Sequence, residues 1–211
     1  MQSVKFSLRS TKVRRIAKLI FAVIAGLTLF FFLMRFLPLR EQDEDFEFLR
    51  LVNEDNSLPA HYSPELAEVE GVQVSLSCAE ALSAMLSAAR EEGCEPVLLE
   101  GYLDRKSLKS KADMDEHQLG LTVDIVDKSY QEKDLQLAQS DTYKWLEENC
   151  WEYGFVIRYP ENKTDVTGGG FMPWHYRYVG LESAKLMFEL GLCLEEYNTW
   201  FYSDEVIIVM D

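Results

Sequence analysis

Residues 171–180 decide the fold, and they read Phe-Met-Pro-Trp-His-Tyr-Arg-Tyr-Val-Gly. Three consecutive glycines, residues 168–170, precede this stretch, and an alternating run rich in aromatic side chains follows His175. The pattern predicts a glycine-rich loop that enters a β-strand, with His175 at the start of that strand. A histidine in this position is free to point into a cleft.

A second stretch of similar character surrounds His117, one of three histidines in the chain. Residues 115–124 read Asp-Glu-His-Gln-Leu-Gly-Leu-Thr-Val-Asp, and the alternation over residues 119–126 predicts a strand. Asp124 lies on the face of that strand toward which His117 can fold. A catalytic zinc site needs three protein ligands and one open position, so His117, Asp124 and His175 are candidate ligands for zinc or a similar divalent ion. An ordinary strand-end histidine beside a solvated carboxylate is the alternative that the spacing leaves open.

The charge of the chain is divided unevenly along its length. Residues 1–40 hold eight of the 21 lysines and arginines and none of the 36 acidic residues. The rest of the chain therefore carries 13 basic against 36 acidic side chains, a formal charge of −23. Nucleic acid and anionic lipid surfaces repel such a domain, and we exclude nucleic-acid binding on that ground.

The N-terminal region has the pattern of a membrane anchor. Residues 16–37 are apolar except for Lys18 and Arg35 and have the length of a bilayer-spanning helix. A cleaved signal peptide is the alternative, but no small-residue cleavage site ends the segment. We predict a single-pass protein of the cell membrane, with residues 1–15 as a basic cytoplasmic tail. Residues 38–47 then form an acidic linker to an extracytoplasmic domain.

Residues 48–211 have the pattern of one α+β domain with a central, mainly antiparallel sheet and flanking helices. Ser77 and Glu80 form a capping box that predicts the start of a helix, and Gly93 predicts its end. Apolar runs predict further strands at residues 48–53, 96–102, 119–126, 154–160 and 205–210. Helices are predicted at residues 140–153, N-capped by Ser140 or Asp141, and at residues 181–190, followed by the segment 194–197.

The four cysteines all fall in the predicted outer domain; they are Cys78, Cys94, Cys150 and Cys193. An even number of cysteines outside the cell permits two disulfides, and buried unpaired thiols are the alternative. Cys78 and Cys94 lie at the two ends of one predicted helix, so a bond between them is geometrically disfavoured.

Several other conspicuous side chains have structural interpretations. We predict core positions for the aromatic residues Trp145, Trp151, Phe155 and Trp200. Arg158 and Arg177 alternate with aromatic residues on predicted strands, where we expect them to pair with acidic side chains. His61 lies in a turn-rich segment and is predicted to be a surface residue.

The chain resembles the zinc D-alanyl-D-alanine carboxypeptidases of the VanY type, which are related in fold to hedgehog-like zinc domains. The matching stretches occur in the family's order at residues 51–53, 101–102, 116–125, 145–146, 153–160, 167–168, 173–180 and 194–197. The resemblance implies a hedgehog/D,D-peptidase fold with zinc bound by His117, Asp124 and His175. It also implies removal of the C-terminal D-alanine from peptidoglycan stem peptides or their precursors. We assign substrate-binding roles to Tyr102, Arg105, Gln118 and Trp174.

Met172 is the main departure from this family pattern. The family reads Glu-Pro-Trp-His before the last ligand, and its glutamate is the general base, whereas this chain has Met172 at that position. A thioether accepts no proton at a useful pH, and losing a positioned base typically costs about 10²–10⁴ in rate. No catalytic residue is therefore assigned. Glu100 and Glu116 are the nearest candidates for a substitute base.

Three more departures lie around the same cleft. Leu103 stands where the family usually has an arginine, although Arg105 follows two residues later, and the segment 103–116 is short for the family. Asp115 replaces a common serine. The sequence thus predicts a preserved scaffold that carries a zinc carboxypeptidase with impaired or altered hydrolysis. A non-catalytic peptidoglycan-binding or regulatory pseudoenzyme is the alternative, and a structural domain without metal is the third.

Overall fold

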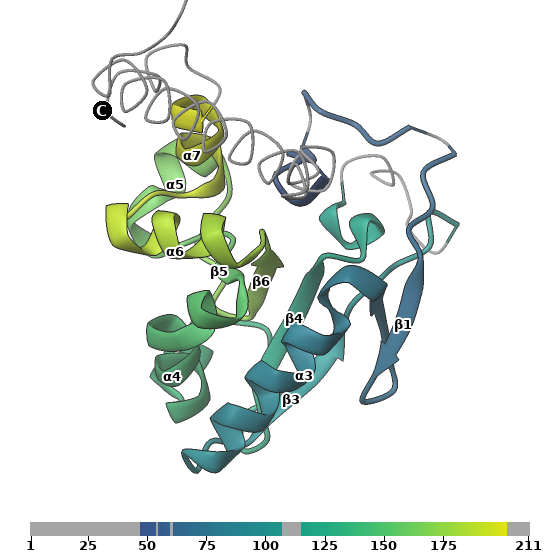
Figure 1. The fold of residues 1–211 in the computed structure, drawn as a ribbon. Helices are drawn as coiled ribbons and strands as arrows, with labels where there is room; N and C mark the ends of the chain where they lie inside the picture. The colour runs from purple at the N-terminus through teal and green to yellow at the C-terminus, as the bar shows by residue number, and fades with distance from the viewer. Residues whose placement is uncertain (1–46, 54, 60, 107–114, 202–211) are drawn as a thin grey trace, which may run out of the picture. The chain divides into compact units, whose positions relative to one another are not determined.

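A computed structural model places a four-stranded antiparallel sheet at the centre of the domain (Figure 1). The strands are β3 (Pro96–Glu100), β4 (Thr122–Asp127), β5 (Phe155–Ile157) and β6 (His175–Tyr178). Their order across the sheet is β3-β4-β6-β5, and every neighbouring pair is antiparallel. The predicted α+β class is confirmed, and four of the predicted strands exist with somewhat shorter bounds.

The structure describes residues 47–53, 55–59, 61–106 and 115–201, which belong to the unit Asp43–Asp211. The predicted membrane span at residues 16–37, nearly all of the acidic linker and the predicted strand at 205–210 lie outside these residues. Within the described ranges, no helix is both long enough and apolar enough to cross a bilayer.

A hairpin that the sequence pattern does not predict precedes the longest described helix. Its strands, β1 (Leu66–Val69) and β2 (Val72–Ser75), pair antiparallel. Glu70 and Gly71 form the turn, and both have positive φ, the backbone conformation of a tight two-residue hairpin turn that favours glycine. The chain then enters α3 (Leu76–Glu91) directly from β2, and Figure 1 shows α3 beside the hairpin.

The start of α3 differs from the prediction. The N-cap is Ser75 rather than Ser77, and no side chain accepts a hydrogen bond there. Ser75 is fixed by a tertiary contact instead, because its backbone N–H donates to the carbonyl oxygen of Gly120 at 2.7 Å. The predicted apolar face is confirmed, since it buries Leu82, Met85, Leu86 and Ala89.

Shorter helices and helical turns complete the domain. They are η2 (Glu116–Leu119), η3 (Leu135–Gln139), α4 (Asp141–Asn149), η4 (Cys150–Tyr153), η5 (Glu161–Lys163), α5 (Thr164–Thr167), α6 (Leu181–Leu190) and α7 (Leu194–Phe201). The helix predicted at 140–153 is thus divided into α4 and η4. Its predicted N-cap is right, because the hydroxyl of Ser140 accepts a hydrogen bond from the backbone N–H of Tyr143 at 3.1 Å.

Residues 48–53 do not form the predicted strand. The backbone carbonyls of Phe48 and Arg50 accept hydrogen bonds from the guanidinium of Arg177, at 3.0 Å and 2.9 Å. Arg177 is fully buried, so its donors must find acceptors inside the protein. The segment supplies those acceptors from its backbone, which a sequence pattern does not reveal.

The structure decides between the alternatives for the cysteines and tests the predicted core aromatic residues. All four cysteines are unpaired buried thiols, so the alternative of two disulfides is not realised. Phe155 is fully buried, and Trp145 and Trp151 pack half-buried against the two apolar clusters of the core. Trp200 is 36% exposed, so its predicted core position is wrong. His61 is exposed, as predicted.

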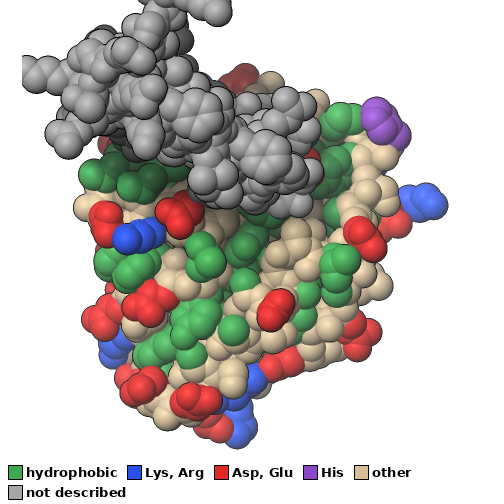
Figure 2. Space-filling view, viewed as in Figure 1, with side chains coloured by type: hydrophobic (Ala, Val, Ile, Leu, Met, Phe, Trp, Pro, Cys, Tyr) green, Lys and Arg blue, Asp and Glu red, His purple; other side chains and the backbone are tan. Residues whose placement is uncertain are grey.

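Acidic side chains are spread over the face of the domain that Figure 2 shows. They lie between hydrophobic and neutral side chains, and fewer lysines and arginines accompany them. This distribution agrees with the acidic composition of the chain beyond residue 40. A phosphate backbone would find no continuous basic surface on this face.

A buried ion cluster ties the ends of the domain together. The guanidinium of Arg158 donates to Glu116 at 2.8 Å and to Glu195 at 2.6 Å, and Arg177 lies 3.6 Å from Glu116. Burial alone would raise the pKa of Glu116, but the facing charges of Arg158 and Arg177 lower it below its ordinary value. The predicted pairing of both arginines with acidic residues is confirmed.

We predict that Arg158→Met destabilises the domain strongly. The substitution leaves the Glu116 carboxylate buried without its main partner, which typically costs about 3–5 kcal/mol of unfolding free energy. Lys128→Met is the matched control, because Lys128 and Glu95 form an exposed ion pair worth about 0–1 kcal/mol. Urea unfolding of the unit Asp43–Asp211 measures both. Equal losses in the two variants would contradict the prediction.

Candidate metal centre

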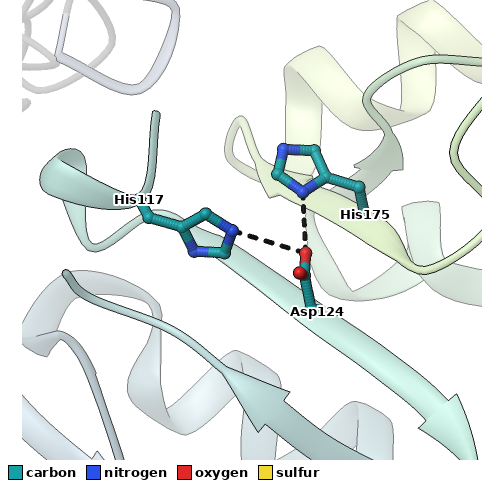
Figure 3. A group of neighbouring side chains, drawn as sticks. All are labelled: His117, Asp124 and His175. Carbon is teal, nitrogen blue, oxygen red and sulfur yellow. Dashed lines mark hydrogen bonds and ion pairs between the residues drawn. The ribbon is translucent and has the colours of Figure 1, made fainter. Parts of the chain in front are cut away.

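Three side chains from three elements converge on one face of the sheet (Figure 3). His117 lies in η2, Asp124 lies in β4, and His175 is the first residue of β6. Asp124 and His175 are direct partners in the β4–β6 ladder, so their side chains leave the sheet on the same face. Figure 3 shows both imidazole rings beside the carboxylate of Asp124. The structure therefore brings together all three residues predicted as ligands.

One oxygen of Asp124 lies close to both rings. Oδ1 of Asp124 is 2.7 Å from Nδ1 of His175 and 3.4 Å from Nε2 of His117. Each residue offers one ligand atom, and these atoms all lie within 4.8 Å of one another. The three side chains are also buried. Two imidazoles and a carboxylate grouped in this way form a candidate site for a single metal ion.

Local hydrogen bonds fix how His117 presents its ring. Nδ1 lies 2.7 Å from the carbonyl oxygen of Gly101, and a carbonyl only accepts, so Nδ1 carries the proton and Nε2 is the ligand atom. The carboxylate of Asp115 caps η2 by accepting from the backbone N–H of His117 at 2.9 Å. Gly120 ends this turn with a φ of 69°, and a Cβ there would meet the backbone nitrogen of Ser75 at 2.8 Å. Only glycine fits that position.

The hydrogen bonds and charges around Asp124 favour its ionised form. Burial alone would raise the pKa of Asp124, but hydrogen bonds from His117 and His175 hold it far below its ordinary value. Burial alone would lower the pKa of His117, but its hydrogen bond with Asp124 and the charge of that carboxylate raise it, so a metal ion would displace a proton from Nε2. Lys133 adds a positive charge, with Nζ 2.9 Å from Oδ2 of Asp124. Asp124 is therefore ionised, as a metal ligand must be.

The donor set fits a divalent transition-metal ion. Imidazole nitrogens and a carboxylate oxygen are the ligands of many catalytic zinc sites, which keep a fourth position open. Zinc bonds of about 2.0–2.2 Å in a tetrahedron separate neighbouring ligand atoms by about 3.3 Å. Nε2 of His117 and Oδ1 of Asp124 are 3.4 Å apart. An ion would be held through these two atoms and through Nδ1 of His175, which lies closer to Oδ1 of Asp124, at 2.7 Å, than two zinc ligands do.

Met172 supports the triad through its backbone. Its carbonyl oxygen accepts a hydrogen bond from the backbone N–H of His175 at 3.2 Å, and its own N–H donates to the carbonyl of Tyr159 at 3.1 Å. The ring of Tyr159 stacks on that of His175, with 5.5 Å between the centroids. The thioether itself is not a proton acceptor. Met172 thus holds the entry to β6 in place and supplies no base.

The two carboxylates considered as substitute bases are both engaged in ion pairs. Glu116 is buried in the ion cluster with Arg158, so it is excluded as a base. Glu100 pairs with Nζ of Lys133, and its side chain is 40% exposed. Because Glu100 is the register partner of Asp124, it lies on the triad's side of the sheet. A carboxylate held by a lysine therefore stands beside the candidate metal site.

The residues predicted to bind substrate lie on the segments that carry the triad. They are Tyr102 and Arg105 after β3, Gln118 beside His117 in η2, and Trp174 before His175. Gln118 is buried and its amide donates to the carbonyl of Asp115 at 3.5 Å, whereas the other three are half-buried. Their roles stay predictions. Residues 107–114, most of the short segment 103–116, lie outside the described residues.

Three residues that support the site were missed from the sequence. Asp115 replaces a serine that is common in the family, and serine and aspartate are both good N-caps, which accounts for the exchange. Tyr159 lies within a family motif, and nothing in that motif indicates its contact with His175. Lys133 reaches Asp124 from a polar loop nine residues further along, and no spacing rule signals such a contact.

The chain is similar to several known proteins. A family model described as VanY: D-alanyl-D-alanine carboxypeptidase matches residues 104–181. A D-alanyl-D-alanine carboxypeptidase of Enterococcus faecalis (strain ATCC 700802 / V583) is 36% identical over 188 residues, which cover 75% of this chain and 68% of that protein. A mutant of the vancomycin resistance D,D-pentapeptidase VanY, solved in complex with Zn(II), has a TM-score of 0.64 and 32% identity, covering 72% of this chain and 99% of that one. The LdcB LD-carboxypeptidase, solved for its peptidoglycan recognition, has a TM-score of 0.65 and 33% identity, covering 71% and 84%.

The antiparallel sheet and its His-Asp-His group place the domain in the fold class of the zinc D,D-peptidases. The chain belongs to the VanY D-alanyl-D-alanine carboxypeptidase family. The resemblance found in the sequence is confirmed. The matched part of the chain spans about two thirds of the Enterococcus faecalis protein and nearly all of the solved VanY structure.

We predict that zinc stabilises the domain through the triad. An ion that binds the folded state alone adds about 2.7 kcal/mol to the unfolding free energy at a free concentration 100 times its dissociation constant. His117→Ala removes a ligand and should abolish the gain, whereas His61→Ala alters an exposed loop histidine and should retain it. Thermal unfolding with and without zinc measures the gain. An equal gain in both variants would mean that zinc binds elsewhere.

Proposed function

We propose that this protein is a membrane-anchored, extracytoplasmic, zinc-dependent D-alanyl-D-alanine carboxypeptidase homologue that acts on peptidoglycan stem peptides. We propose further that its hydrolysis is impaired or altered. The observation that carries the proposal is a complete triad, His117, Asp124 and His175, beside Met172. The ligand set supports metal binding, and the methionine supports a loss of proton transfer.

The triad residues have separable tasks in this proposal. His117 presents Nε2 because Gly101 holds its Nδ1 proton, and Asp124 presents Oδ1 because Lys133 engages Oδ2. His175 presents Nδ1 from the first position of β6, braced by the ring of Tyr159. When bound, a divalent ion supplies Lewis acidity, which polarises a peptide carbonyl and activates a water. The chain's own part is to hold the ion and to orient the peptide.

Proton transfer is the step for which the chain lacks a general base at the family's position. A general base must lie within hydrogen-bond reach of the proton that it abstracts, and the thioether of Met172 cannot accept one. Glu116 is ionised, and its charge is balanced by Arg158 inside the buried ion cluster. Glu100 is paired with Lys133. Turnover, where it occurs, relies on polarisation of the substrate carbonyl with no dedicated base at the Met172 position.

The proposed location follows from the sequence of the N-terminal region. Residues 16–37 have the length and apolarity of a membrane span, and the basic residues 1–15 favour a cytoplasmic N-terminus. The acidic domain would then face the wall polymer outside. The LdcB LD-carboxypeptidase, described for peptidoglycan recognition, supports a substrate of this class.

A second candidate function is a non-catalytic one. Met172 favours it, because the scaffold and the ligand set are intact while the position beside His175 lacks an ionisable group. Such a protein would bind peptidoglycan stem peptides or regulate other enzymes of the wall. Its site would still hold the metal and the peptide. The two functions differ only in turnover, which an activity measurement separates.

We predict that Met172→Glu raises D-alanine release from a peptide ending in D-Ala-D-Ala. Restoring a base at this position should increase the rate by about 10²–10⁴, because that is the usual contribution of general base catalysis. The zinc-loaded unit Asp43–Asp211 is assayed by detection of free D-alanine. Met172→Gln is the matched control, since it has the size of glutamate but no basic oxygen, and it should give no increase.

The controls decide between the two candidate functions. The unmodified protein could release D-alanine at a rate that His175→Ala abolishes and Met172→Glu does not raise. That result would contradict impaired hydrolysis and would require another general base. Release only in Met172→Glu would mean that one substitution silences an intact scaffold. Silence in both, with peptide binding retained, would support the non-catalytic function.

A further inference from the structure

Lys133 holds an unusual place beside the candidate metal centre. Its Nζ lies 2.9 Å from Oδ2 of Asp124 and also forms an ion pair with Glu100. An ammonium group has three donors, so one of them is left for a further acceptor. The side chain of Asp124 is 3% exposed, whereas that of Lys133 is 37% exposed. The ammonium group thus lies between the buried triad and solvent.

The two buried arginines near the site cannot take the same part. Arg158 and Arg177 are essentially inaccessible, and their guanidinium groups are committed to Glu116, Glu195 and backbone carbonyls. Removing either arginine from those partners would leave buried charges unpaired. Lys133 is accessible and still touches a ligand of the metal centre, so an incoming anion can reach it.

A carboxypeptidase substrate brings an anion to this place. Its terminal carboxylate belongs to the residue that is removed, so it lies about one residue, or roughly 3.8 Å of chain, from the scissile carbonyl. A carbonyl positioned at the triad therefore places the carboxylate within a few ångströms of the triad's edge. Asp124 and Glu100 outnumber Lys133 by one charge, and a divalent ion in the triad reverses that sign.

We propose that Lys133 is the residue that receives the terminal carboxylate of the substrate, an inference that rests on the carboxypeptidase function proposed above. Lys133 is then a specificity-determining residue, because it distinguishes a chain end from an amide or an internal peptide. The lysine gains a third acceptor and keeps its contact with Asp124. One side chain thereby recognises the C-terminus of the substrate and orients the metal ligand Asp124.

Glu100 lowers the affinity of Lys133 for the substrate carboxylate. It stands opposite Asp124 in the β3–β4 ladder, next to a register irregularity between Leu98 and Glu100. From there its carboxylate holds Lys133 and competes with the substrate for the same ammonium group. Removing the charge of Glu100 should therefore tighten binding of the anion, whereas removing Lys133 should weaken it. Opposite effects from two neighbouring residues are hard to produce by general damage to the fold.

Calorimetric binding to the zinc-loaded full-length protein in detergent tests the proposal. The two probes are the dipeptide D-Ala-D-Ala and its C-terminal amide, with a check that each is intact after the titration. The unmodified protein should bind the acid at least about tenfold more tightly than the amide, as a charge-assisted hydrogen bond implies. Lys133→Met should abolish this preference, and Lys133→Arg should restore most of it.

Two further variants complete the test. Glu100→Gln should tighten binding of the acid by roughly threefold and leave the amide unchanged. Lys128→Met removes another lysine of the same loop, one that pairs with Glu95 at the surface, and should change neither. Zinc content is measured for every variant.

Each outcome has one meaning. A preference for the acid that survives Lys133→Met overturns the assignment of Lys133 and leaves the proposed function standing. Loss of zinc from Lys133→Met also overturns it, because the lysine would then serve only to support Asp124. Failure of the unmodified protein to bind either probe contradicts the proposed substrate class, and the assignment falls with it.

Discussion

The pairing of Asp124 with His175 across two antiparallel strands is the constraint on which the site depends. The β4–β6 ladder sets these residues directly opposite each other, and their side chains meet at 2.7 Å. His117 needs only the short turn η2 to bring Nε2 within 3.4 Å of the same carboxylate oxygen. A sheet register, rather than a mobile loop, therefore sets the spacing of two of the three ligand atoms.

Buried ion pairs next to the triad stabilise the positions of its ligand atoms. Glu116, next to His117, is fixed by Arg158 and Arg177, and Arg177 in turn binds the backbone carbonyls of Phe48 and Arg50. Glu195 in α7 closes the cluster from the C-terminal side. The network links segments far apart in the sequence to the residue beside a ligand. Its cost in desolvation is offset only while every member keeps its partners.

Much of this arrangement could be predicted from the sequence, because it depends on local patterns. The alternation of apolar and polar residues around His117 and His175 indicates strand ends. The sequence motifs shared with the family identify the candidate ligands. The hairpin at residues 66–75 was missed because its four-residue strands are short and mostly not buried. Ser77 was preferred to Ser75 because the contact of Ser75 with Gly120 is tertiary. Lys133 was missed for the same reason, since its partners come from other parts of the chain.

We infer that His117, Asp124 and His175 hold one metal ion on the sheet. Anomalous diffraction at the zinc edge from crystals grown with zinc tests it most directly. We expect a single strong peak within bonding distance of Nε2 of His117, Oδ1 of Asp124 and Nδ1 of His175, at about 2.0–2.2 Å. A triad without a peak, or a peak bonded to Nδ1 of His117 in place of its contact with Gly101, would contradict it.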